Sequence, residues 1–184
     1  MLKNDLHIHT LASGHAYSTI LESVQFAASV GVETIAITDH GPSTAGGPHV
    51  GYFTIMDRIP RKMNGVNVLM GCEANVIDCN GKIDLPASVA DKLDIILAGL
   101  HEHTPYPVNL SSKENTAALI KAIEKNAVHI VSHPYHPNFP VDIYDLIKAA
   151  NDCGVILELN LALLKVSKQD KDFLRQIYLM IETI

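Results

Sequence analysis

The chain has 184 residues, of which 47% are hydrophobic and 18% are charged, and its formal net charge is −6. This length suits a single domain with a sizeable core, and the composition argues against a disordered protein. The acidic balance gives no electrostatic reason to expect stable nucleic-acid binding, and no apolar run reaches the roughly 18 residues of a membrane helix.

Short apolar segments alternate with amphipathic, helix-like segments along the chain. We predict buried parallel strands over residues 4–9, 33–38, 66–72, 93–100, 128–132 and 155–159. Helices are predicted over residues 19–30, 114–126, 143–152 and 167–184, and Gly31 and Gly154 are expected to cap two of them. This order predicts one α/β domain over residues 1–184, built as an open doubly wound sheet or as a parallel (βα) barrel.

The cysteines bear on the cellular compartment. Cys72, Cys79 and Cys153 show no Cys-x-x-Cys spacing, and no secretory leader is recognisable at the N-terminus. We interpret them as reduced thiols of a cytoplasmic protein, with Cys72 as a small core residue.

Metal-capable side chains fall at the ends of the predicted strands. His7 and His9 alternate on the first strand, so both side chains are expected on one face. The next four strands are followed in turn by His40, Glu73, His101 and His133. Because active sites of parallel α/β folds assemble at the carboxyl ends of strands, these residues are expected to converge there.

Imidazole and carboxylate ligands together suit zinc, manganese or iron. The number of candidates predicts more than one ion, since a catalytic zinc usually takes three protein ligands. His15 lies in a loop, and its spacing alone does not decide whether it is a ligand. The remaining loop histidines, His49, His103 and His136, are expected to be exposed or near the substrate, and His129 to be structural.

Several polar residues near these candidates leave two interpretations open. Asp5 and Asp39 could each orient an imidazole, or form a salt bridge or cap. Glu158 and Asn160 could support the site or pack at the sheet edge. Arg58 or Arg61 could contact a phosphate, although a solvated surface charge is the favoured interpretation.

The ordered motifs "DLHIHT", "AITDH", "GCEAN", "AGLHE" and "VSHP" resemble those of the PHP (polymerase and histidinol phosphatase) family. The segments "ASGHAYST" and "DHGP" are similar to its small, single-domain zinc phosphatase branch. The resemblance implies a distorted seven-stranded (βα) barrel with a trinuclear metal cluster at its mouth. It implies two to three divalent ions, with the ligands His7, His9, His15, His40, Glu73, His101 and His133.

By the same resemblance, His7, His9 and Glu73 would hold one ion, and Glu73 would bridge to a second ion. His101 and His133 would complete the second site, and His15 and His40 would begin the third. Glu73 and His101 are then the residues expected to act in catalysis, through a metal-bound water.

One expected motif is missing from the sequence. Members of the family continue into a seventh strand that ends in an Asp-x-His motif, whereas about six βα units are expected here. On this reading the chain is incomplete at its C-terminus, and the first and sixth strands would have unpaired edges that favour self-association.

The resemblance implies a metal-dependent phosphatase that hydrolyses a small phosphorylated substrate. Two alternatives are a phosphodiesterase of the exonuclease type and a catalytically weakened metal-binding scaffold. The short, acidic chain argues against the first, and the missing strand is the reason to consider the second.

Overall fold

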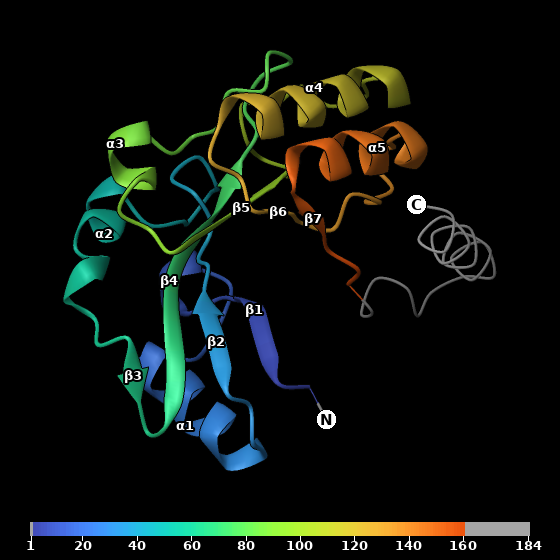
Figure 1. Ribbon diagram of the computed structural model, residues 1–184. Coiled ribbons are helices and arrows are strands. Elements are labelled where there is room, and N and C mark those ends of the chain that lie inside the picture. The colour runs from blue at the N-terminus through green and yellow to red at the C-terminus, as the bar shows by residue number, and fades with distance from the viewer. Residues whose placement is uncertain (1, 161–184) are drawn as a thin grey trace.

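The computed structural model describes residues 2–160 and contains one parallel sheet with helices packed around it (Figure 1). Its strands are β1 (Asn4–Ile8), β2 (Thr34–Ile37), β3 (Lys62–Met63), β4 (Val66–Asn75), β5 (Ile95–Gly99), β6 (Ile130–Val131) and β7 (Ile156–Leu157). Six of them run parallel in the order β1-β2-β4-β5-β6-β7, and β3 pairs antiparallel with β4. The expected α/β fold is confirmed as a parallel half-barrel sheet, and each of the six predicted strands is present.

The helices are α1 (Ile20–Val30), α2 (Val50–Thr54), α3 (Ala87–Ala90), α4 (Ser112–Lys125) and α5 (Ile143–Cys153), with short 3-10 turns η1 (Leu11–Ser13) and η2 (Met56–Arg58). Helix α1 packs against β2 and β4, whereas α4 and α5 lie side by side over the other end of the sheet (Figure 1). Gly31 and Gly154 end α1 and α5 in the left-handed conformation, as predicted. The helix predicted over residues 167–184 lies outside the described residues.

Strand β4 is longer than predicted because it joins the two halves of the sheet. Its residues 67–70 pair with β2, and its residues 71–75 pair with β5. In the first half buried residues alternate with exposed Asn67 and half-buried Leu69, while every residue from Met70 to Asn75 is buried. The hairpin strand β3 was not predicted, since two residues provide no period from which a strand can be recognised.

Strands β1 and β7 lie at the two ends of the strand order in the described part of the chain. Self-association through these edges stays a prediction. No helix within residues 2–160 is long and apolar enough to cross a membrane.

The turn after β4 is fixed to α4 and provides a test of the fold. Gly81 has a φ of 76°, and a Cβ atom there would overlap the backbone of Lys121 and Ala122 in α4. Gly65 has a φ of 83°, but a Cβ atom there would meet nothing within 4 Å. Both positions are therefore strained for alanine, and only Gly81 also has a steric clash.

We predict that Gly81→Ala lowers the free energy of unfolding by about 2 to 4 kcal/mol, through strain plus overpacking. Gly65→Ala, which carries the strain alone, is expected to cost about 1 kcal/mol. Chemical denaturation of both variants measures the difference. Equal losses would show that α4 does not pack on this turn.

Candidate metal centre

The seven predicted ligands line one hollow of about 330 Å³ at the carboxyl ends of the strands. The residues lining it are His7, His9, His15, His40, Glu73, His101, His133, His136, Glu158 and Asn160. They come from segments spread over the whole described chain and meet because parallel strands deliver them to the same edge. Convergence of these residues agrees with the sequence analysis, while their role as ligands stays a prediction.

Glu73 lies at the centre of this cluster and is completely buried. Its N–H donates to the carbonyl of Asp39, which fixes the register between β4 and the segment after β2. Five imidazole nitrogens surround its carboxylate: His40 Nδ1 and His133 Nε2 at 2.9 Å, His101 Nε2 at 3.0 Å, His7 Nε2 at 3.2 Å and His9 Nε2 at 3.3 Å. Burial alone would raise the pKa of Glu73, but His101 and the other imidazoles hold it well below its usual range.

Each oxygen of Glu73 faces a different set of histidines. Oε1 lies next to His101 and His133, whereas Oε2 lies next to His7, His9 and His40. A carboxylate that has candidate metal ligands next to each of its oxygens is suited to bridge two ions.

His7 is held from both sides by carboxylates. Its Nδ1 lies 2.9 Å from Glu158 Oε1, and its Nε2 faces Glu73. Burial lowers the pKa of His7, but the hydrogen bonds with Glu158 and Glu73 outweigh it and raise the pKa to about 10. Glu158 also accepts from the N–H of His133 at 2.8 Å. The open question about Glu158 is thus answered: it supports two of the candidate ligands.

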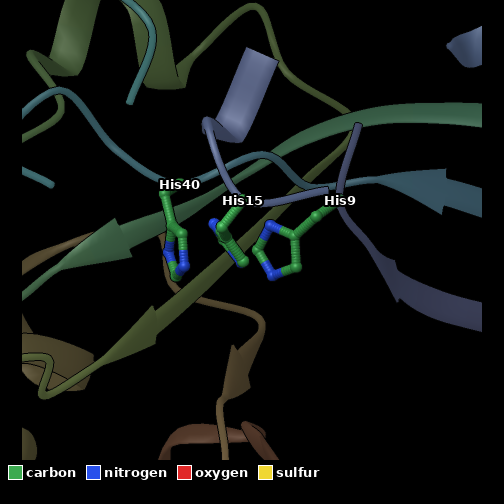
Figure 2. A group of neighbouring side chains, drawn as sticks. All are labelled: His9, His15 and His40. Atoms are coloured by element: carbon green, nitrogen blue, oxygen red, sulfur yellow. The ribbon is translucent and has the colours of Figure 1, made fainter. Parts of the chain in front are cut away.

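The imidazoles of His9, His15 and His40 form a second part of the cluster, drawn in Figure 2. Their ring centroids are 4.4 to 5.0 Å apart. One ligand atom from each lies within 4.8 Å of the other two, and His7–Glu73–His133 and His40–Glu73–His101 form groups of the same kind. His15 therefore joins the cluster, although it comes from an exposed loop.

The donor set fits divalent metal ions. Imidazole nitrogen and carboxylate oxygen are ligands of zinc, manganese and iron. Within residues 2–160, the buried atoms His40 Nδ1, Glu73 Oε2 and His101 Nδ1 form no hydrogen bond, although the first two lie only 2.9 Å apart. Buried lone pairs without partners cost free energy, and a cation between His40 and Glu73 would offset that cost.

The groups differ in their membership from those that the family resemblance implies. His7 shares a group with His133, and His9 shares one with His15 and His40. His40 also shares one with Glu73 and His101. His9 Nε2 nevertheless lies 3.1 Å from His7 Nε2, so the groups are contiguous. Which residues bind which ion stays a prediction.

The two aspartates have different surroundings. Asp5 accepts a hydrogen bond from the backbone N–H of His7 at 3.3 Å, which is a local backbone contact. Asp39 is completely buried, and its carboxylate accepts from Thr10, Ser13 and Tyr52. Neither aspartate is bonded directly to an imidazole by these contacts. Ser13 and Tyr52 were not predicted from the sequence, because nothing in their spacing marks them as partners of Asp39.

The other candidates lie away from the centre or at its rim. Arg61 pairs with Asp94 at 2.9 Å, and Arg58 is exposed, so both arginines are surface charges. His129 is exposed, and its Nδ1 accepts from the N–H of Ile96 at 3.1 Å, which is a structural role.

The rim residue His136 lines the hollow, and burial lowers its pKa. His49 caps α2, and His103 is exposed. Cys72 is a buried core residue, as expected, and burial raises the pKa of its thiol.

Sequence alignments with curated relatives include most of this chain but only part of each relative. A probable phosphatase of Caldanaerobacter subterraneus subsp. tengcongensis is 46% identical over 156 residues, which are 85% of this chain and 61% of the relative. A probable phosphatase of Clostridium novyi is 39% identical over 164 residues, which are 89% of this chain and 66% of the relative. One from Proteus mirabilis is 44% identical over 156 residues, which are 85% of this chain and 63% of the relative. The chain thus spans a little under two thirds of these relatives.

A solved structure has the same fold. The crystal structure of a histidinol phosphate phosphatase from Lactococcus lactis, in complex with zinc, L-histidinol and phosphate, superposes with a TM-score of 0.57. It covers 88% of this chain and 74% of the neighbour at 15% identity, so it supports the fold alone. The family model described as the PHP domain matches residues 5–148. The motifs, the half-barrel and this match together show that the chain belongs to the PHP domain family.

Proposed function

We propose that this domain forms the metal centre of a phosphatase that hydrolyses small phosphomonoesters with two or three divalent ions. The observation that carries the proposal is the buried carboxylate of Glu73, surrounded by five imidazoles at the mouth of a parallel sheet. The three relatives described above are named probable phosphatases, which supports the same reaction class. Zinc is the expected ion, with manganese or iron as alternatives.

The lining of the hollow explains why such a site depends on cations. Its described lining consists of histidines, two glutamates and one asparagine, with no lysine or arginine among them. A phosphate group entering it would meet the negative charges of Glu73 and Glu158. Divalent ions would supply the positive charge for the phosphate oxygens and lower the pKa of a water molecule to give the nucleophile.

The protein's own residues hold this site in place. Glu73 keeps the imidazoles around a single buried negative charge, and Glu158 orients His7 through its Nδ1. At the rim, His136 Nδ1 accepts from the N–H of Asn138 at 3.3 Å, so the neutral ring carries its proton on Nε2. We assign to His136 a hydrogen-bond donor role toward the substrate.

A phosphatase assay tests the reaction class. The purified chain with added zinc or manganese is expected to release phosphate from a small aryl phosphate, and His7→Ala to lower the rate at least about 100-fold. His103→Asn is the matched control, because His103 is exposed and has a φ of 59°, which asparagine tolerates. Equal rates in the wild type and His7→Ala would refute the assignment.

The choice of substrate separates the phosphatase from the exonuclease alternative. A mononucleotide is expected to lose its phosphate faster than single-stranded DNA loses nucleotides. The reverse order would identify a phosphodiesterase, and tight zinc binding without turnover of either compound would identify a metal-binding scaffold.

Metal binding is expected to release protons, because the pKa of His7 is raised to about 10. Below pH 10 the free ring holds a proton on each nitrogen, and a metal ligand needs a lone pair on one of them. We predict that zinc binding at pH 8 releases at least one proton and that affinity rises with pH. Calorimetry in two buffers of different ionisation enthalpy measures this release.

Glu158→Gln is the informative variant, since it removes a charge that raises the pKa of the His7 ring. Its zinc binding should release fewer protons at pH 8 than that of the wild type. Identical proton release in both proteins would show that Glu158 does not control the protonation of His7.

A further inference from the structure

Ser13 contacts each of the three histidines drawn in Figure 2. It ends the 3-10 turn η1 after β1 and is only 1% exposed. Its Oγ lies 2.9 Å from His9 Nδ1 and accepts from the backbone N–H of His40 at 3.1 Å. Its carbonyl oxygen lies 3.1 Å from His15 Nδ1.

The hydrogen bonds of Ser13 determine where the protons lie. A hydroxyl has one proton to donate and two lone pairs to accept with. The third neighbour of Ser13 Oγ is Asp39 Oδ1, at 2.7 Å. A carboxylate is the stronger acceptor, and this contact is shorter than the one to His9, so the hydroxyl proton goes to Asp39. His9 Nδ1 must then donate to Ser13.

Asp39 is itself held by other donors. Its carboxylate accepts from Thr10 N at 2.6 Å, Thr10 Oγ1 at 2.8 Å and Tyr52 Oη at 2.6 Å. Burial and the bond to Asp39 raise the pKa of Tyr52, so its phenol keeps its proton and donates. Ser13 therefore hydrogen-bonds to a fixed and fully buried acceptor.

The same reasoning fixes His15. A carbonyl oxygen can only accept, so the contact with the carbonyl of Ser13 places a proton on His15 Nδ1. His9 and His15 in their neutral forms then both have a free lone pair on Nε2. In His9 this atom faces the cluster, 3.3 Å from Glu73 Oε2.

We infer that Ser13, anchored by Asp39, is the positioning residue of the His9–His15–His40 site. It sets the tautomers of His9 and His15 so that Nε2 is free to bind an ion, and it holds the backbone of His40. This inference rests on the proposed metal centre. It also assigns Asp39 a role that acts through Ser13 on the ligands.

The test compares two buried serines next to candidate ligands. Ser13→Ala removes the acceptor of His9 Nδ1 and of the His40 N–H. Ser132→Ala is the control, because Ser132 is equally buried at 1%, precedes His133, and its Oγ forms no hydrogen bond within residues 2–160. Zinc content is measured by mass spectrometry after equilibrium dialysis at a series of free zinc concentrations.

Ser13→Ala is expected to weaken the binding of one ion by about 10- to 100-fold, with the others retained, and Ser132→Ala to match the wild type. Wild-type zinc affinity in Ser13→Ala, or an equal loss in Ser132→Ala, would overturn the inference. Absence of zinc from the wild type would instead contradict the proposed metal centre.

A second measurement needs no variant. Nitrogen NMR of the zinc-loaded wild type reports which ring nitrogen of His9 carries a proton. A proton on Nδ1 is expected, with Nε2 bound to zinc. A proton on Nε2 would refute the role of Ser13, even if Ser13→Ala failed to fold.

Discussion

A single buried charge organises this domain. Glu73 has no exposed surface, and an isolated carboxylate in that position would be very costly, so its surroundings have to compensate for the lost hydration. Five imidazoles from four strand ends and their loops do so. Strands β1, β2, β5 and β6 must therefore stay in register with β4, since a shift of one residue would turn the histidines to the other face.

Three of the imidazoles are oriented through Nδ1, each by a different type of hydrogen-bond acceptor. His7 is oriented by Glu158, and His9 by the hydroxyl of Ser13. His15, which lies on an exposed loop, is held by a backbone carbonyl. These contacts are made by Nδ1 of each ring, so Nε2 is left for an ion, in His7 after the loss of one proton. They also link the candidate metal centre to Asp39, a carboxylate as deeply buried as Glu73.

The sequence was sufficient to predict the sheet and the ring of inward side chains, because both follow from local patterns. Apolar runs mark the strands, and the histidines and the glutamate at the ends of these runs mark the carboxyl edge of the sheet, where the site lies. Ser13 and Tyr52 were not predicted, and Glu158 was left open between two interpretations, since their roles depend on contacts such as that between His7 and Glu158, 151 residues apart. The arginines show the converse: Arg61 had suitable chemistry, but it pairs with Asp94 instead.

We propose that Glu73 would be shared between two ions, one near each carboxylate oxygen. Anomalous diffraction at the zinc edge, from crystals of the zinc-loaded protein, tests it directly. We expect one peak next to Oε1 with His101 or His133, and another next to Oε2 with His7, His9 or His40. Fewer than two peaks in contact with Glu73 would contradict it.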